Sequence, residues 1–356
     1  MREGWTYKNF EDCLVKAPKA KQVQTSQYNT GTKFPIVSQE DTLISGFFDD
    51  DAYLFHIDNP IVVFGDHTRV LKYIDFDFVV GADGVKILIP KEFLNAKLLY
   101  YYLLWYKIPN LGYSRHYKLL KEIDIPIPSL SEQQSIVAEL DKINELISLK
   151  KAQLSDLDSL AQSIFYDMFG DPIENEKGWE VKKLSDVSTL LNGRAYKQNE
   201  LLSEGKYKVL RVGNFFTNSN YYYSNLELED DKYCDFGDLL FAWSASFGAF
   251  VWSGEKVIYH YHIWKVLYDK SYLNKLYYCY LLNTMTNSFM NDLHGIGMMH
   301  LTKVGMEQYQ LPLPPLSLQQ DFAKRIELIE QQKAQISSTI KDLETLLASR
   351  MQYWFD

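Results

Sequence analysis

The stretch that decides the architecture of this chain is IPIPSLSEQQ at positions 125–134, which recurs as LPLPPLSLQQ at positions 311–320. The same offset of 186 residues continues downstream, where Asp156-Leu157 match Asp342-Leu343. Self-similarity over such a distance is the mark of an internal duplication. The sequence therefore predicts two copies of one structural unit.

The beginnings of the two copies match as well. Gly4-Trp5-x-x-Lys8 pairs with Gly178-Trp179-x-x-Lys182 at an offset of 174, so the second copy holds about a dozen extra residues in its loops. We therefore expect four regions: a first domain over 1–130, a spacer helix and linker over 131–177, a second domain over 178–316 and a second spacer helix over 317–356.

The stretches 131–169 and 317–355 are predicted to be long helices. Their apolar residues recur in steps of four and three, as in Ile136, Leu140 and Ile143, which is typical of a coiled-coil seam. The prolines just upstream prevent an earlier helix start, and Ser131-x-x-Gln134 predicts a capping box, as does Ser317-x-x-Gln320. We expect the two helices to form an antiparallel spacer.

Each domain contains short apolar runs that predict strands, followed by one Tyr-rich helix. The runs include 34–37, 61–64, 78–80 and 85–89 in the first domain and 207–212, 239–243, 250–252 and 263–267 in the second, with helices at about 94–107 and 273–290. The expected fold class is α+β: two α/β domains, each around a twisted, partly barrel-like sheet, separated by two long antiparallel helices with an internal pseudo-two-fold repeat.

The composition is that of an ordinary globular protein, with 46% hydrophobic and 23% charged residues. No apolar run approaches the length of a membrane span, and no signal peptide is visible, so we expect no membrane association. Three widely separated cysteines favour a reduced, cytoplasmic protein. The net charge of −9 weakly disfavours nucleic acid, yet each domain by itself carries only −1 and has room for a basic face.

A search for catalytic motifs finds little. The chain has no glycine loop of the Walker A type, no GxSxG turn and no glycine-rich loop for AdoMet. Asp58-Asn59-Pro60 lacks the aromatic residue that completes a methyltransferase motif, and His260-x-His262 lacks a third metal ligand nearby. We expect no catalytic residue, no metal and no cofactor in this chain.

The order of the motifs, repeated twice, resembles the specificity subunit of Type I restriction–modification systems. The residues that carry the resemblance are Gly178-Trp179-x-x-Lys182, Lys208-Val209-Leu210-Arg211-Val212-Gly213-Asn214, Gly295-x-Gly297-x-x-His300 and the stretch 311–320. The resemblance implies that the domains are target-recognition domains, each reading one half of a bipartite sequence in double-stranded DNA. It implies that the helices set the spacing and dock two modification (methyltransferase) subunits, which recruit restriction and translocase subunits, and that the chain itself is not a catalyst.

DNA binding needs cations for phosphates and polar side chains for base edges. The candidates in the second domain are Arg194, Lys197, Arg211, Asn214, Trp243, Ser244, Ser246, His260, His262 and His300. Those in the first domain are Gln39, His67, Arg69, Lys72, Arg115, His116 and Lys118. The two sets differ because the first domain has Ser38-Gln39-Glu40-Asp41 where the second has Arg211-Val212-Gly213-Asn214.

Two other classes of function stay open at this point. One is a coiled-coil scaffold that presents two protein-binding domains and no DNA-binding surface, which the absence of a basic face would support. The other is a divergent DNA methyltransferase or nuclease, which a bound cofactor or metal would support.

Overall fold

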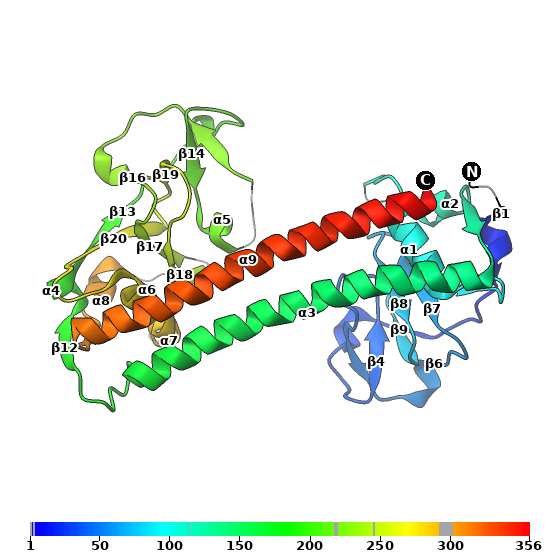
Figure 1. Cartoon of the computed structure of the whole chain (residues 1–356), viewed down its shortest axis with the longest axis horizontal. Coiled ribbons are helices and arrows are strands. Elements are labelled where there is room, and N and C mark those ends of the chain that lie inside the picture. Colours follow the sequence, from blue (N-terminus) through cyan, green and yellow to red (C-terminus); the bar gives the residue numbers. More distant parts are fainter. Residues whose placement is uncertain (1, 3, 113, 217–219, 245, 292–301) are drawn as a thin grey trace. The chain divides into compact units, whose positions relative to one another are not determined.

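A computed structural model describes residues 2, 4–112, 114–216, 220–244, 246–291 and 302–356 (Figure 1). The chain divides into two compact units. The first unit comprises Met1–Ala152 and Ser337–Asp356, and the second comprises Gln153–Ile336. Each unit therefore contains one globular domain with part of each long helix. No helix in the described ranges is long and apolar enough to cross a membrane.

The first unit contains a two-stranded ribbon and two larger sheets. The ribbon pairs β1 (Thr6–Asn9) with β11 (Asp124–Ile127), and the four-stranded sheet has the order β2 (Leu14–Val15), β10 (Val85–Pro90), β7 (Ile61–Gly65), β8 (Leu71–Ile74). The other sheet has the order β3 (Gln22–Val23), β9 (Phe78–Gly81), β4 (Phe34–Val37), β5 (Gly46–Phe48), with β6 (Leu54–Phe55) also on β9. The helices are α1 (Ala96–Tyr106), α2 (Tyr117–Leu120) and α3 (Leu130–Phe169), which continues into the second unit; η1 (Phe10–Cys13), η2 (Thr25–Gln27) and η3 (Asp51–Tyr53) are short 3-10 turns.

The second unit repeats this topology. The ribbon pairs β12 (Glu180–Lys183) with β21 (Gln310–Leu313), and the four-stranded sheet has the order β13 (Ser188–Asn192), β20 (Ile263–Tyr268), β17 (Leu239–Ser244), β18 (Ser246–Val251). The other sheet has the order β15 (Tyr222–Ser224), β14 (Tyr207–Leu210), β19 (Val257–Tyr259), β16 (Tyr233–Cys234). The helical elements are α4 (Leu184–Val187), η4 (Gln198–Glu200), α5 (Val212–Phe216), η5 (Asp230–Lys232), α6 (Lys275–Thr284), α7 (Thr286–Asn291), α8 (Lys303–Glu307) and α9 (Leu316–Phe355).

The two units correspond strand by strand except for β3, which has no counterpart in the second unit. This correspondence confirms the duplication read from the sequence and the mixed α/β class. Both second sheets share one parallel pair, β4 with β9 and β14 with β19, and the first unit adds a second parallel pair, β3 with β9. The expectation of a single sheet per domain is corrected: each domain has two sheets and a ribbon. The expected strand at 207–212 ends at Leu210 because the chain turns into α5 at Val212.

The Tyr-rich helices α1 and α6 are buried in their units. In the first unit Leu98, Leu99 and Tyr102 of α1 are buried in a cluster that includes Ile136 of α3 and Phe355 of α9. In the second unit, Tyr277 of α6 stacks on Phe165 of α3 with ring centres 5.9 Å apart, and Phe165 packs edge-on against Phe322 of α9. In each unit, therefore, the Tyr-rich helix packs together with both long helices.

One buried glutamine joins each long helix to its domain. Gln133 is 0% exposed; its Oε1 accepts the Asn95 N–H (2.7 Å), and its Nε2 donates to the carbonyl oxygens of Phe93 (2.8 Å) and Pro128 (2.9 Å). Gln319 makes the equivalent three bonds to Asn274, Tyr272 and Pro314. The glutamine thus ties the first turn of the long helix to the cap of the Tyr-rich helix.

The expected capping boxes at Ser131 and Ser317 are wrong. Both helices begin one residue earlier than expected, at Leu130 and Leu316, so these serines lie inside the first turn. In α3 the hydroxyl of Ser129 accepts the Glu132 N–H instead, at 3.3 Å.

The long helices run antiparallel in each unit. In the first unit Arg350 pairs with Glu139, and Lys151 pairs with Glu344 at 3.0 Å. In the second unit Lys333 of α9 bonds Asp158 of α3 at 2.7 Å. The residue numbers of the partners rise along α3 as they fall along α9, so the helices are antiparallel, as the sequence predicted for the spacer.

Candidate nucleic-acid interface

A cavity of about 440 Å³ opens at one edge of the second unit. Three connections line it: the turn after β14, the β17–β18 hairpin and the turn between β19 and β20. Six of the residues expected to bind DNA line this cavity, namely Arg211, Asn214, Ser244, Ser246, His260 and His262. The structure therefore gathers positions up to fifty residues apart in the sequence at one place.

Strand direction explains why these connections meet. β14 and β19 are parallel neighbours, so both end at the same edge, and the His260 N–H donates to the Leu210 carbonyl there (2.9 Å). β17 runs antiparallel to β20, so the end of β17 lies beside the start of β20, where the Trp243 N–H donates to the His262 carbonyl (3.1 Å).

The cavity carries one exposed cation beside two imidazoles. The Arg211 guanidinium lies over the Tyr222 ring, 5.2 Å from its centre, and no carboxylate of the described chain forms a salt bridge with it. Burial, reinforced by His262 and Arg211, lowers the pKa of His260 to about 4. His260 is therefore neutral at pH 7; its Nδ1 accepts the His262 N–H at 3.4 Å, so Nε2 carries the proton and is the donor.

Two expected residues support the loops that form the cavity: Asn214 in its lining and Trp243 beside it. Trp243 stacks on Trp264, with ring centres 5.4 Å apart, packs edge-on against His262, and donates its Nε1–H to the Tyr261 carbonyl (2.9 Å), so it supports the turn that carries the histidines. Asn214 accepts the Arg211 N–H with its Oδ1 (2.8 Å) and donates its Nδ2–H to the Asn220 carbonyl (3.0 Å). Its amide thereby holds the loop that presents Arg211.

The loop after β13 is locally neutralised. Arg194 makes a bidentate pair with Glu200, at 3.0 and 2.8 Å, and this pair lowers the pKa of Glu200 to about 2. Lys197 in the same loop is exposed. His300 lies outside the described residues, so its position in the structure is not described.

The equivalent edge of the first unit is filled. Lys72 is 4% exposed and donates from Nζ to the carbonyl oxygens of Ser38 (2.8 Å) and Thr42 (2.5 Å), and its burial lowers its pKa. His116 is 0% exposed and bonds the Asp66 carbonyl through Nδ1 (3.0 Å) and the Leu111 N–H through Nε2 (3.0 Å). Both side chains are occupied inside the domain, so we leave them out of the proposed interface.

The other expected residues of the first unit lie nearer its surface. Gln39 accepts the His67 N–H at 3.3 Å, and Arg69 donates to the Ile108 carbonyl at 3.1 Å. Arg115 and Lys118 are exposed. These side chains remain candidates for contact with DNA.

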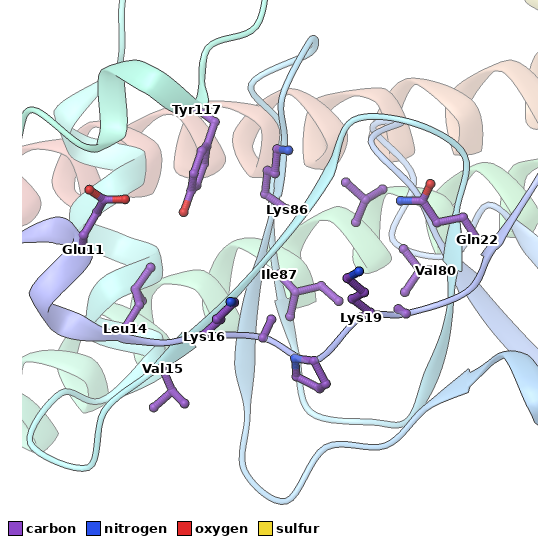
Figure 2. A pocket seen from close by; sticks show the side chains of 14 residues that line it. Glu11, Leu14, Val15, Lys16, Lys19, Gln22, Val80, Lys86, Ile87 and Tyr117 are labelled. Atoms are coloured by element: carbon purple, nitrogen blue, oxygen red, sulfur yellow. The ribbon is translucent and has the colours of Figure 1, made fainter.

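Sequence reasoning missed residues on both units. In the second unit Phe216 and Tyr222 also line the cavity, and both are about two-fifths exposed, as their places in a Tyr/Phe-rich run between β14 and β15 allow. In the first unit Lys16, Lys19 and Lys86 border a groove (Figure 2). Lys16 and Lys19 belong to a stretch without acidic residues at 13–37, which was a readable signal, whereas Lys86 comes from a distant strand.

Comparison with known proteins decides the family. A family model described as "Type I restriction modification DNA specificity domain" matches residues 2–158 and, a second time, residues 176–345. The chain belongs to this family. Each of the two matches begins near the Gly-Trp pair of one domain and ends within a long helix.

Relatives and solved structures agree with this assignment. The chain is 32% identical over 157 residues to the Type I restriction enzyme MjaIX specificity subunit of Methanocaldococcus jannaschii, covering 36% of each chain. It is 24% identical over 199 residues to the EcoR124I/EcoR124II specificity subunit of Escherichia coli, covering 52% of this chain and 48% of that one. These alignments therefore span only about a third to a half of the relatives' length.

The fold is shared with two solved structures. The S subunit of a Type I restriction–modification system from M. genitalium superposes with a TM-score of 0.58 at 14% identity, covering 99% of this chain and 96% of that one. A chain from a study of complex assembly and conformational transition of the Type I R-M system gives a TM-score of 0.56 at 17% identity, covering 99% and 98%. At these identities the likeness shows the fold alone.

Proposed function

We propose that this chain is the sequence-specific DNA-binding subunit of a Type I restriction–modification complex. In this account each domain reads one half of a bipartite target in double-stranded DNA. The observation that carries the proposal is the double match to the DNA specificity domain. The two matches fall on two units of similar topology that differ at the surface proposed to contact DNA. Two domains of similar fold that differ at the surface proposed to contact DNA suit a target made of two unlike half-sites.

The cavity of the second unit has the groups that base reading needs. An arginine fork pairs with the O6 and N7 of guanine in the major groove, and neutral imidazole or hydroxyl groups accept or donate to other base edges. Arg211, His260 and Ser246 supply these groups at one edge of the domain. Lys197, Arg115 and Lys118 are exposed cations suited to phosphates, which fix position without specifying sequence.

The long helices are suited to hold partner subunits. Large apolar side chains stay exposed on them: Leu149 (58%) and Leu160 (48%) on α3, and Leu328 (60%) and Leu346 (45%) on α9. Leu160 and Leu346 occupy the same position in the two copies. Equivalent apolar positions on both copies suit two copies of one modification subunit, which would in turn bring the restriction and translocase subunits. The lengths of α3 and α9 would set the gap between the half-sites.

The chain would act without chemistry of its own, and the modification subunits would supply the methyl transfer. Among the described residues no group of three or more His, Cys, Asp or Glu side chains is arranged to hold a metal ion. The family match favours this function over a protein-binding scaffold and over a divergent methyltransferase or nuclease.

The test is the methylation pattern of cells that carry this chain with its modification subunits. Methylation-sensitive sequencing should show one bipartite motif with a fixed gap, and the motif should vanish when this chain alone is deleted. A continuous motif, or a motif that persists without the chain, would contradict the proposal.

A further inference from the structure

An open groove of about 600 Å³ lies on the first unit, where Asp66 links its residues Lys86 and Tyr117 to His116 of the filled edge. Its floor and walls come from the connection between β2 and β3, from Val85 to Ile87 of β10, and from Tyr117 of α2. Figure 2 shows Lys16 and Lys19 on the connection, with Lys86 and Tyr117 across the groove from them.

The groove has a surplus of positive charge. Lys16 and Lys19 are exposed, and neither forms a salt bridge within the described ranges. Lys86 lies 3.6 Å from Asp66, but that carboxylate is 2% exposed and its Oδ1 already accepts the Tyr117 N–H at 2.7 Å. Glu11 is the acidic residue of the lining, and Lys121 holds it at 2.6 Å.

The sequence around the groove shows the same bias. Residues 13–37 contain four lysines and no acidic residue, in a chain whose net charge is −9. Like charges kept together without internal partners cost free energy through mutual repulsion, which a bound polyanion relieves. The concentration of lysines at this connection therefore points to an anionic ligand.

We infer that this groove binds the phosphate backbone of double-stranded DNA beside the half-site of the first domain, through Lys16, Lys19 and Lys86. The inference rests on the proposed function and adds a contact region to it. Lysine contacts to phosphates carry affinity and steer the approach of DNA, whereas base edges carry the specificity.

The form of the groove favours a run of phosphates over a single bound phosphate. Sites for one phosphate commonly use backbone N–H groups from a glycine-rich loop or a helix N-terminus. Here Pro18 removes an N–H from the middle of the connection, and residues 16–21 form neither helix nor strand. Lysines spread along an open groove, with no backbone cradle, suit the repeating charge of DNA.

The equivalent connection of the second unit differs in charge and in space. The equivalent connection there follows β13, and its Arg194 is neutralised by Glu200. That connection is also closed against the β19–β20 turn, since a Cβ atom on Gly193 would lie 2.4 Å from the His260 carbonyl oxygen. The second unit keeps one exposed lysine there, Lys197, whereas the first unit combines an open groove with two exposed lysines, Lys16 and Lys19.

The experiment measures DNA affinity of the full-length chain in complex with its modification subunits, over a series of salt concentrations. One duplex carries the mapped target and another carries a scrambled target. The double variant Lys16→Gln/Lys19→Gln should weaken binding to both duplexes by the same factor, roughly tenfold, and should lower the slope of log affinity against log salt by about 2. The matched control is Lys33→Gln, an exposed lysine of the same unit that pairs with Asp51 outside the groove and should leave the slope unchanged.

Each contrary result has its own meaning. Unchanged affinity and slope in the double variant would overturn the inference, and so would a loss confined to the target duplex, which would indicate base reading. Loss of the complex on gel filtration with DNA affinity kept would assign the groove to an acidic protein surface and would also overturn it. Failure of the unmodified complex to bind its target duplex would instead contradict the proposed function.

Discussion

The two units have similar folds, but they differ at the sheet edge where the cavity of the second unit lies. In the second unit the edge formed by the turns after β14 and β19 is an open cavity with Arg211 exposed and His260 neutral. In the first unit the corresponding edge is occupied by the buried Lys72 and His116, and the exposed Lys16 and Lys19 border the adjoining groove. The difference shows that the two copies keep the buried glutamine contacts of Gln133 and Gln319 and differ at the surface. Two domains that recognise different half-sites require such a difference.

The largest expected effect concerns the buried glutamine that both units share. Gln133→Leu and Gln319→Leu should each destabilise their own unit by about 3 kcal/mol, because each leaves two buried carbonyl oxygens and one N–H without partners. Chemical unfolding of the full chain measures the change. The neighbouring exposed glutamines provide matched controls, Gln134→Leu and Gln320→Leu, which should cost less than about 0.5 kcal/mol. A large loss of unfolding free energy in one of the two variants with little loss in the other would show that Gln133 and Gln319 are not equivalent.

The next effect concerns stability at acid pH, which should differ between the two units. The pKa of His260 is about 4 in the folded chain and 6.5 for an unperturbed imidazole, so the unfolded state takes up a proton first as the pH falls. The second unit should therefore be fully stable above pH 6.5 and lose about 3 kcal/mol as the pH falls to about 4. The first unit has Ala82-Asp83-Gly84 at the equivalent turn and lacks this contribution.

Thermal unfolding between pH 4 and pH 7 checks this sign. The variant His260→Gln should flatten the pH dependence, since its side chain does not titrate. An equally steep acid loss in this variant would assign the effect to another group.

A smaller effect concerns specificity. Arg211→Ala should reduce discrimination in the second half-site by about 1.5 kcal/mol, because the exposed guanidinium is the charged donor of the cavity, and should leave the first half-site as it was. Competition binding with duplexes that carry single base-pair changes measures it. Arg194→Ala is the matched control, since Glu200 already holds that guanidinium. Relaxation at both half-sites would argue against separate reading heads.

The smallest effect concerns phosphate contact by the second unit. Lys197→Gln should lower the salt slope by about 1 and weaken all duplexes alike by a few-fold. Salt-dependent anisotropy titrations measure it. A sequence-dependent loss would place Lys197 at a base edge instead.

The sequence predicted much of the fold because duplication and helical periodicity are regular signals. The repeated Pro-x-Pro stretch located the starts of both long helices to within one residue. The same repeat also predicted that the two domains share a topology. The role of Gln133 and Gln319 was not predicted, because their partners lie on segments some forty residues away and leave no local pattern.

The candidate site was predicted in the second domain and only in part in the first. Arg211 and the two histidines follow strands that end at one edge, so strand direction brings them together. Polarity alone does not show that Lys72 and His116 are buried, since their hydrogen-bond partners are carbonyl groups of distant turns. Likewise Lys86 joins the groove only through the fold of β10.

The measurement that tests the central claim most directly is the methylated target of a chimera. Residues 178–316 would be replaced by the equivalent segment of a relative with a known target, and methylation would be mapped in cells that carry the modification subunits. The account predicts that one half of the bipartite motif changes to that of the relative while the other half and the gap stay the same. A chimera that methylates DNA but changes both halves, or neither, would contradict the claim that each domain reads one half.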